Sequence, residues 1–188
     1  TTGFNCGPAF TARCKYLEAA PSGWNGTNEG GTRTWAQSTP IDYHLTTVSN
    51  ASSPETATAT AIGWGYFNTR AIVLQGNTAT ATSAAALADS HTVTVRGLEF
   101  DDWYLPSKDE LNQMCKWQRG VAWTSDATVC TGGTTNTGPG AAGFVTLYQS
   151  SSEAAIASKA WKQFFQSGGQ IDSYEKNDPV YVRPIRAF

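Results

Sequence analysis

The segment from Trp103 to Leu111 places the strongest constraint on the fold, because it predicts a strand end that runs directly into a helix. Ser107 is a favoured N-cap residue, and Glu110 three residues later completes the pattern of a reciprocal capping box. Asp109 and Glu110 also place negative charge in the first turn, where the helix dipole favours it. We therefore predict a helix from Lys108 to about Gln118. Taken alone, this pattern is typical of any well-capped core helix.

The length and composition predict one loop-rich domain. A chain of 188 residues is long enough to bury its own core, so we expect residues 1–188 to form a single domain. Aromatic residues make up 12% of the chain beside 18 Gly and a single Met, which favours an α+β fold over a helical bundle. The chain begins at Thr1 without Met, and we expect it to be a processed or trimmed part of a longer protein.

Charge and hydropathy exclude two classes of partner. Charged residues are 15% of the chain, the formal net charge is −2, and no basic run occurs, which argues against nucleic-acid binding. No apolar run approaches the roughly 20 residues that a membrane span needs. The expected partners are a protein or glycan on another surface, or further copies of the chain.

The four cysteines predict two short disulfide-closed loops. Cys6 lies close to Cys14 in the sequence, and Cys115 lies close to Cys130, so we predict these two pairs, with four reduced thiols as the alternative. The chain has no Cys-x-x-Cys motif and only two His, which argues against a metal site. Oxidised cysteines indicate an exported protein, located extracellularly or on a cell or virion surface.

Hydrophobic periodicity and turn residues predict several short elements. Helices are expected at the end of residues 63–75, where Asn68 or Thr69 can act as the cap, and over Ser83–Asp89. Strands are expected at residues 15–20, 92–96, 144–148, 160–165 and 180–183. The Gly- and Thr-rich segments 24–54 and 119–143 are predicted as loops. The second is expected to be a surface loop tethered by Cys130, with a loop over a binding site as the alternative.

Several separated motifs occur in order in the second half of the chain. They are Trp103–Leu111, the Ser150–Glu153 element, the Ala160-Trp161 strand, the Gly168-Gly169 turn and the ending Tyr181–Phe188. In this combination the chain resembles the bacterial C-type-lectin-like domains found at the ends of collagen-like adhesins and in variable proteins of diversity-generating retroelements. The resemblance covers residues 97–188 strongly and Leu17–Pro21 more weakly. It implies a C-type-lectin-like α+β fold, with short helices around small antiparallel sheets.

The resemblance implies a binding protein. We expect an extracellular ligand-binding or adhesion domain that uses an exposed face of its C-terminal hairpin. The alternative is a structural subunit of a surface filament, an appendage or a virion fibre, because the family's usual first strand has no counterpart here and an unseen segment or a neighbour could supply it. The candidate ligand-binding residues are Gln149, Lys162, Phe164, Ile171, Asp172, Ser173, Tyr174 and Asp178.

Strand alternation places side chains on this hairpin. Trp161, Phe165, Tyr181 and Arg183 are expected to point inward, and Lys162, Phe164 and residues 171–174 are expected to form one outward patch. Phe164 and Tyr174 are the expected anchors. Residues 171–174 each differ by one adenine change from an Asn codon, which is consistent with retroelement diversification. Lys162 and Gln166 do not fit that origin, and an ordinary surface loop remains the alternative. Glu153 and Arg183 are expected to form a buried pair.

Enzymatic motifs are missing from the sequence. Formylglycine-generating enzymes, the distant fold relatives, carry a reactive cysteine pair near the C-terminus, whereas this chain has no cysteine after Cys130. His44 and His91 do not fit a Ser-His-Asp order. Adjacent Asp101 and Asp102 would face opposite ways on a strand, so we expect solvated turn residues. No cofactor is expected. Calcium, the less favoured alternative, would use oxygens of residues 175–179, although Lys176 lies among them.

Overall fold

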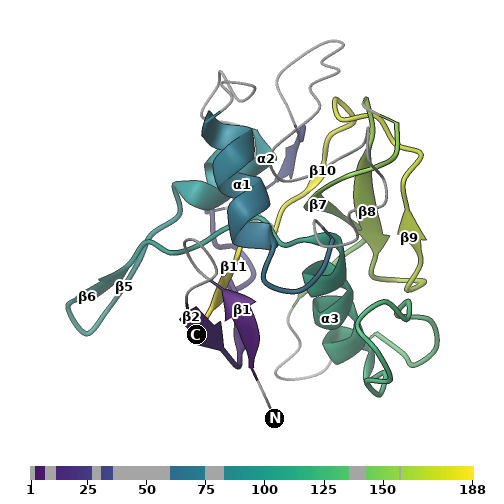
Figure 1. Ribbon diagram of the computed structural model, residues 1–188, viewed down its shortest axis with the longest axis horizontal. Coiled ribbons are helices and arrows are strands. Elements are labelled where there is room, and N and C mark those ends of the chain that lie inside the picture. The colour runs from purple at the N-terminus through teal and green to yellow at the C-terminus, as the bar shows by residue number, and fades with distance from the viewer. Residues whose placement is uncertain are drawn as a thin grey trace.

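A computed structural model describes residues 3–6, 12–26, 31–35, 60–74, 83–135, 143–156 and 158–188. In these residues the protein is a mixed α+β structure with short helices and small sheets (Figure 1). The helices are α1 (Gly65–Leu74), α2 (Ala84–Asp89) and α3 (Lys108–Arg119). The strands are β1 (Phe4–Cys6), β2 (Ala12–Cys14), β3 (Leu17–Ala19), β4 (Thr32–Arg33), β5 (Val93–Val95), β6 (Leu98–Phe100), β7 (Leu147–Glu153), β8 (Ala160–Phe164), β9 (Gln170–Ile171), β10 (Val180–Tyr181) and β11 (Ile185–Ala187).

The largest sheet has the strand order β4-β10-β7-β8-β9, with β7 at its centre. Strands β7, β8 and β9 form consecutive antiparallel pairs, whereas β10 runs parallel to β7. Three further pairs are two-stranded, namely β1-β2, β11-β3 and β5-β6. The β5-β6 hairpin projects from the body of the molecule (Figure 1). Its turn is Arg96-Gly97, and both residues have positive φ, as a tight two-residue hairpin requires.

The predicted capping box begins α3. The Ser107 hydroxyl accepts a hydrogen bond from the Glu110 amide at 3.3 Å, and the Glu110 carboxylate accepts one from the Ser107 amide at 2.7 Å. The same carboxylate accepts from the Gly63 amide and the Tyr104 hydroxyl. Burial raises the pKa of Glu110 to about 7, while these hydrogen bonds act in the opposite direction. Gly120 ends α3 in the left-handed conformation, at φ 64°.

Among the residues that the structure describes, two hydrophobic clusters form the core, and the segment before α3 enters both. Leu105 packs in the cluster of α1, α2, Trp35 and Val182, whereas its neighbour Tyr104 packs in the cluster of α3, Tyr148 and Ile185. Successive residues of an extended chain point to opposite sides, so this segment joins the two clusters.

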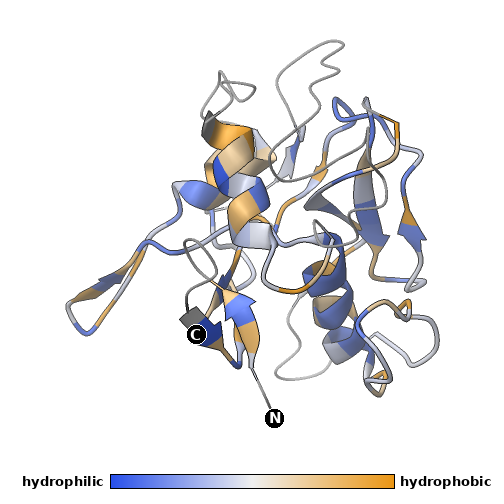
Figure 2. Cartoon of the chain, in the orientation of Figure 1, coloured by the Kyte–Doolittle hydropathy of each residue, from blue (hydrophilic) through white to orange (hydrophobic). Residues whose placement is uncertain are grey.

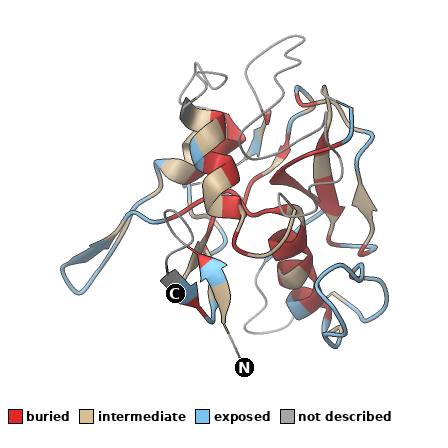
Figure 3. Cartoon of the chain, viewed as in Figure 1, coloured by how far each residue is buried: buried red, intermediate tan, exposed pale blue. Residues whose placement is uncertain are grey.

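Helix α3 is hydrophilic in composition, yet most of it is buried (Figures 2 and 3). Several of its polar side chains donate hydrogen bonds to the carbonyl groups of residues 125–133. Asn112 donates to the carbonyl oxygens of Asp126 and Thr128 at 2.9 and 2.8 Å, and Arg119 donates to that of Gly132 at 2.7 Å. Buried polar groups are tolerated when they are hydrogen-bonded in this way. The described part of the predicted 119–143 loop therefore lies against α3.

Both predicted disulfides are present, Cys6–Cys14 and Cys115–Cys130. The helix over Ser83–Asp89 begins with Ser83 as its N-cap, as predicted. Strand predictions at residues 15–20, 92–96 and 160–165 are confirmed as the shorter β3, β5 and β8. Tyr43, most of the 24–54 segment, Gln75 and residues 136–142 lie outside the described residues.

Two predictions of local structure are wrong, and a third is confirmed only as a shorter strand, β10. Asn68 and Thr69 do not cap α1 but lie inside it, where Thr69 accepts from the Leu105 amide and Asn68 donates to Ser151. The strand expected at 144–148 begins at Leu147 and continues to Glu153. The strand expected at 180–183 ends at Tyr181, and β11 follows after Pro184. In each case partners distant in sequence outweigh local propensity.

Candidate functional site

The segment that joins β9 to β10, residues 172–179, forms a loop at the edge of the large sheet; we call it the 172–179 loop. Its most exposed side chains are Asp172, Ser173, Asn177 and Pro179, whereas Tyr174 and Asp178 are half-buried. Glu175 and Asp178 close a turn within it, because the Glu175 amide donates to the Asp178 carboxylate at 2.9 Å.

Lys162 supports this loop from beneath. It lies in β8 and is only 1% exposed, and its ammonium group donates to the carbonyl oxygens of Glu175 at 2.9 Å and Asp178 at 3.3 Å. The same ammonium lies 4.9 Å from the centre of the Tyr174 ring. Burial lowers the pKa of Lys162 to about 8, and the nearby Asp178 and Glu175 carboxylates oppose this shift. A single buried cation therefore fixes three residues of the loop.

Lys176 forms a second attachment. Its side chain runs inward from the loop and forms a buried ion pair with Glu153 at the end of β7. Its ammonium group lies 4.3 Å from the centre of the buried Trp35 ring. The backbone of Lys176 is also engaged, since its amide donates to Ser158 at 2.7 Å and its carbonyl accepts from Trp35 at 2.8 Å. Strand, loop and the Trp35 segment thus meet at one residue.

The structure separates the eight predicted ligand-binding residues into exposed and covered groups. Asp172 and Ser173 are exposed, as predicted, and Phe164, Ile171, Tyr174 and Asp178 are half-buried. The expected exposure of Lys162 and Gln149 is wrong, since both are fully buried. These two side chains are paired across β7 and β8. Alternation was expected to turn Lys162 outward to solvent, but the 172–179 loop contacts its ammonium group and covers it.

The inward-facing set agrees better with alternation. Phe165 and Arg183 are buried, and Trp161 and Tyr181 are half-buried. Glu153 and Arg183 are both buried. Glu153 pairs with Lys176, and Arg183 donates to the Ala20 carbonyl at 2.9 Å and lies 4.3 Å from the Phe144 ring. A direct contact between Glu153 and Arg183 stays a prediction.

Sequence reasoning missed the two residues that anchor the loop most firmly, Lys176 and Trp35. The available signal was the position of Lys176, a lone cation between Glu175 and Asp178 in a chain of low charge content. Nothing local in the sequence indicates Trp35 as its neighbour, because the two are far apart in the chain.

Other polar groups have structural surroundings. His91 lies between the rings of Trp24 and Trp103, with centroids 4.9 and 5.1 Å away, and burial lowers its pKa. Asp101 and Asp102 are exposed, and Asp102 pairs with Arg186 at 3.3 Å. Among the described residues, no group of three or more His, Cys, Asp and Glu side chains could hold a metal ion. No helix in the same part of the chain has the length and apolarity to cross a membrane.

Comparison with family models, with curated proteins and with solved structures found no match to this chain. The functional inference therefore rests on the molecule's own geometry.

Proposed function

We propose that the protein is an extracellular ligand-binding domain with a C-type-lectin-like fold, and that it presents the 172–179 loop and the neighbouring hairpin side chains to its ligand. The observation that carries this proposal is the support of the loop by Lys162 and Lys176, both buried, while Asp172 and Ser173 of the same loop remain exposed. Burying charged groups is costly unless they are paired and hydrogen-bonded. An exposed loop held at that cost is a suitable platform for recognition, because ordering before binding reduces the entropy lost on binding.

The contacts among the sequence motifs support the proposed fold. The Lys108 amide donates to Ser152 at 3.0 Å, and the Ser151 amide donates to Pro106 at 2.7 Å, so the segment before α3 touches the Ser150–Glu153 element directly. Tyr104 and Ile185 exchange backbone hydrogen bonds of 2.8 and 2.9 Å, which adds the closing motif. Motifs that are separated in sequence therefore form one continuous unit, as a shared fold requires.

The two disulfides support an extracellular location, because such bonds persist in oxidising compartments. The ligand chemistry follows from the surface. Half-buried Phe164, Ile171 and Tyr174 adjoin the polar Asp172 and Ser173, and aromatic side chains held in place are efficient binding anchors. A protein or glycan on another surface fits this mixed character.

An array of glycans and cell-surface proteins provides the test. A variant carrying Asp172→Ser, Ser173→Gly and Tyr174→Ser should lose the array signal of the wild-type protein. Asp172 and Ser173 are exposed and contribute little to stability, and losing the half-buried Tyr174 ring from the Lys162 ammonium should cost on the order of 1–2 kcal/mol, so the variant should stay folded by circular dichroism. The matched control carries Thr94→Ser and Glu99→Ser on the exposed β5-β6 hairpin and should bind normally. Unchanged binding by the loop variant would contradict the proposal.

A second candidate function, a subunit of a surface filament or appendage, is favoured by the β5-β6 hairpin. This hairpin projects from the body, and Val95 and Leu98 near its tip are 49% and 65% exposed (Figure 1). Exposed apolar groups on a projecting arm suit contact with a neighbouring subunit. Electron microscopy and sedimentation should then show assemblies that Leu98→Ser abolishes and the loop variant retains. A protein that stays monomeric at high concentration would contradict this candidate.

A further inference from the structure

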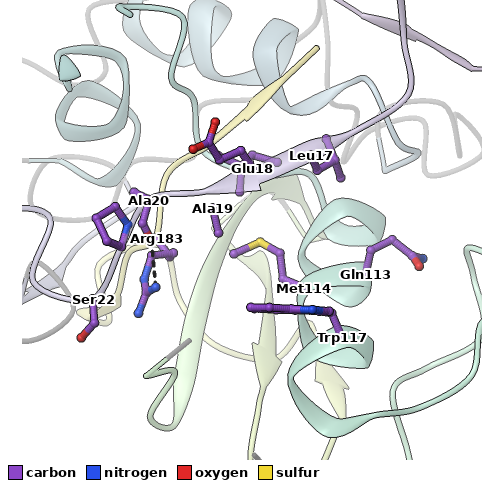
Figure 4. A pocket seen from close by; sticks show the side chains of 11 residues that line it. Leu17, Glu18, Ala19, Ala20, Ser22, Gln113, Met114, Trp117 and Arg183 are labelled. Atoms are coloured by element: carbon purple, nitrogen blue, oxygen red, sulfur yellow. Dashed lines mark hydrogen bonds between the residues drawn. The ribbon is translucent and has the colours of Figure 1, made fainter. Parts of the chain in front are cut away.

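A groove of about 620 Å³ lies between β3 and α3 (Figure 4). One wall is formed by the consecutive residues 17–22, and the facing wall includes Gln113, Met114 and Trp117 of α3. Side chains of a strand alternate between its two faces, so a wall made by consecutive residues is formed largely by the strand's backbone edge. The groove is therefore bounded on one side by the edge of β3 and the residues that follow it, and on the other by α3, and Arg183 and Ile185 of the closing segment complete its lining.

The hydrogen bonding of β3 shows which of its backbone groups face away from β11. Tyr16 and Phe188 exchange backbone hydrogen bonds of 2.9 and 3.1 Å, and the Ala20 amide donates to Pro184 at 2.9 Å. In an antiparallel ladder, hydrogen-bonded residue pairs alternate with pairs whose backbone amide and carbonyl groups point away from the partner strand. Leu17 and Ala19 occupy the alternate register positions, so their amide and carbonyl groups point away from β11. Among the described strands, β11 is the one partner of β3.

The helical wall supplies apolar contact. Met114 and Trp117 are three residues apart on α3 and so share a face. Figure 4 shows the Met114 side chain beside Ala19 and the Trp117 indole ring next to Met114. Met114 is nearly buried, but Trp117 is 64% exposed, which is unusual for so large an apolar side chain. A strand edge with outward backbone groups beside an apolar helix face has the two features that strand addition requires.

We propose that an extended peptide segment of a partner protein binds in this groove as an added strand on β3. Its backbone pairs with Leu17 and Ala19, and its apolar side chains, placed at every second position, pack on Met114 and Trp117. The volume lies within the range of about 300–1,000 Å³ typical of ligand pockets, which suits one strand segment and not a folded domain. This site is separate from the 172–179 loop and does not depend on the function proposed for it.

The probe is a library of short capped peptides in which Val, Leu, Ile or Phe alternates with Thr. Binding is measured by fluorescence polarisation, and each binder is compared with a copy that is N-methylated on alternate residues. N-methylation removes backbone donors and keeps every side chain, so it should abolish binding by an added strand. Amide hydrogen exchange provides a direct readout. Leu17 and Ala19 should exchange fast in the free protein and at least about tenfold more slowly with peptide, whereas Tyr16 and Ala20 should be slow in both states.

Trp117→Ala should weaken peptide binding by about tenfold or more, the effect of removing a central aromatic contact. Trp123→Ala is the matched control, because Trp123 is equally exposed but does not line the groove, and it should leave the affinity unchanged. Both tryptophans are exposed, so both variants should remain folded.

Three results of the peptide measurements would overturn the proposal. They are a library with no binder, binding that N-methylation leaves intact, and binding that Trp117→Ala leaves intact. The second would assign the groove to a compact apolar ligand. Sedimentation of the protein alone tests whether a second copy of the chain occupies the groove. Self-association that Trp117→Ala removes would place that copy there and would also contradict binding of a partner's peptide.

Discussion

The 172–179 loop and the β5-β6 hairpin both present exposed side chains, but they are held in opposite ways. Lys162 and Lys176 attach the loop from within, one through two backbone carbonyl groups and the other through a buried ion pair. The hairpin strands pair with each other and with no other described strand, and Val95 and Leu98 remain exposed. Exposure of a side chain therefore does not reveal whether the backbone beneath it is fixed.

This difference has a functional meaning. A loop ordered before binding loses little entropy when a ligand arrives. A two-stranded hairpin without further support is marginally stable in water, so it gains order when something packs against it. We expect the loop to recognise its ligand as a rigid surface, and the hairpin to adapt to its neighbour.

The largest expected effect comes from breaking the buried attachment of the loop. Lys176→Ala leaves Glu153 buried without this cation, and we expect the free energy of unfolding to fall by about 3–5 kcal/mol. Urea denaturation measures this change. Lys159→Ala is the matched control, because Lys159 pairs with Glu175 of the same loop at 3.8 Å but nearer the surface, and it should cost at most about 1 kcal/mol. Equal effects of the two substitutions would contradict the claim that the buried ion pair of Lys176 stabilises the protein more than the surface pair of Lys159.

A second effect comes from the titration of Lys162. Its pKa is about 8 in the folded protein, against an ordinary value of 10.5. Between these pH values the unfolded chain keeps the proton that the folded protein has lost, so the free energy of unfolding rises with pH in this window. The gain is up to about 3 kcal/mol, at about 1.4 kcal/mol per pH unit.

Lys162→Met isolates this contribution. The variant keeps the apolar stem and lacks the titrating group, so the rise between pH 8 and 10.5 should be smaller than in the wild type. Its 172–179 amides should also exchange hydrogen faster, because the loop carbonyls lose their donor. Superimposable pH profiles would show that burial does not lower the pKa of Lys162, and unchanged hydrogen exchange in the loop would show that Lys162 does not anchor it.

The smallest effect is expected on the hairpin. Leu98→Ala should change the free energy of unfolding by no more than about 0.5 kcal/mol, since exposed substitutions rarely do more. Leu105→Ala, the same change at a fully buried leucine, should cost about 2–5 kcal/mol. A large cost at Leu98 would mean that the hairpin packs against the body, and the contrast with the loop would then be lost.

Local chemistry explains which features the sequence could predict. The capping box of Ser107 and Glu110 depends on residues three positions apart, and both disulfides join cysteines close in sequence. The sequence alone could therefore predict the capping box and both disulfides. The face of β8 that carries Lys162 was also identified by alternation. Whether that face meets water was not, because its cover comes from the 172–179 loop, whose position depends on Glu153 and Trp35.

Asn68 and Thr69 also show that local sequence preference does not determine the role of a residue in the fold. Both are good N-cap residues by local preference, yet the structure uses them inside α1 as hydrogen-bonding partners of Ser151 and Leu105. Their role is set by segments that the sequence places far away.

The strand pairings also set an order of events in folding. Strands β7, β8 and β9 pair as neighbours in sequence, whereas β3 and β4 near the start of the chain pair with β11 and β10 at residues 180–187. Contacts between distant segments form slowly, because the loop between them must close first. We expect the hairpins and the Cys115–Cys130 bridge to form early and the two closing pairs to form last. Until then β3 lacks its β11 partner and β4 lacks its place in the large sheet, so interruption at this step leaves unpaired strand edges that can aggregate.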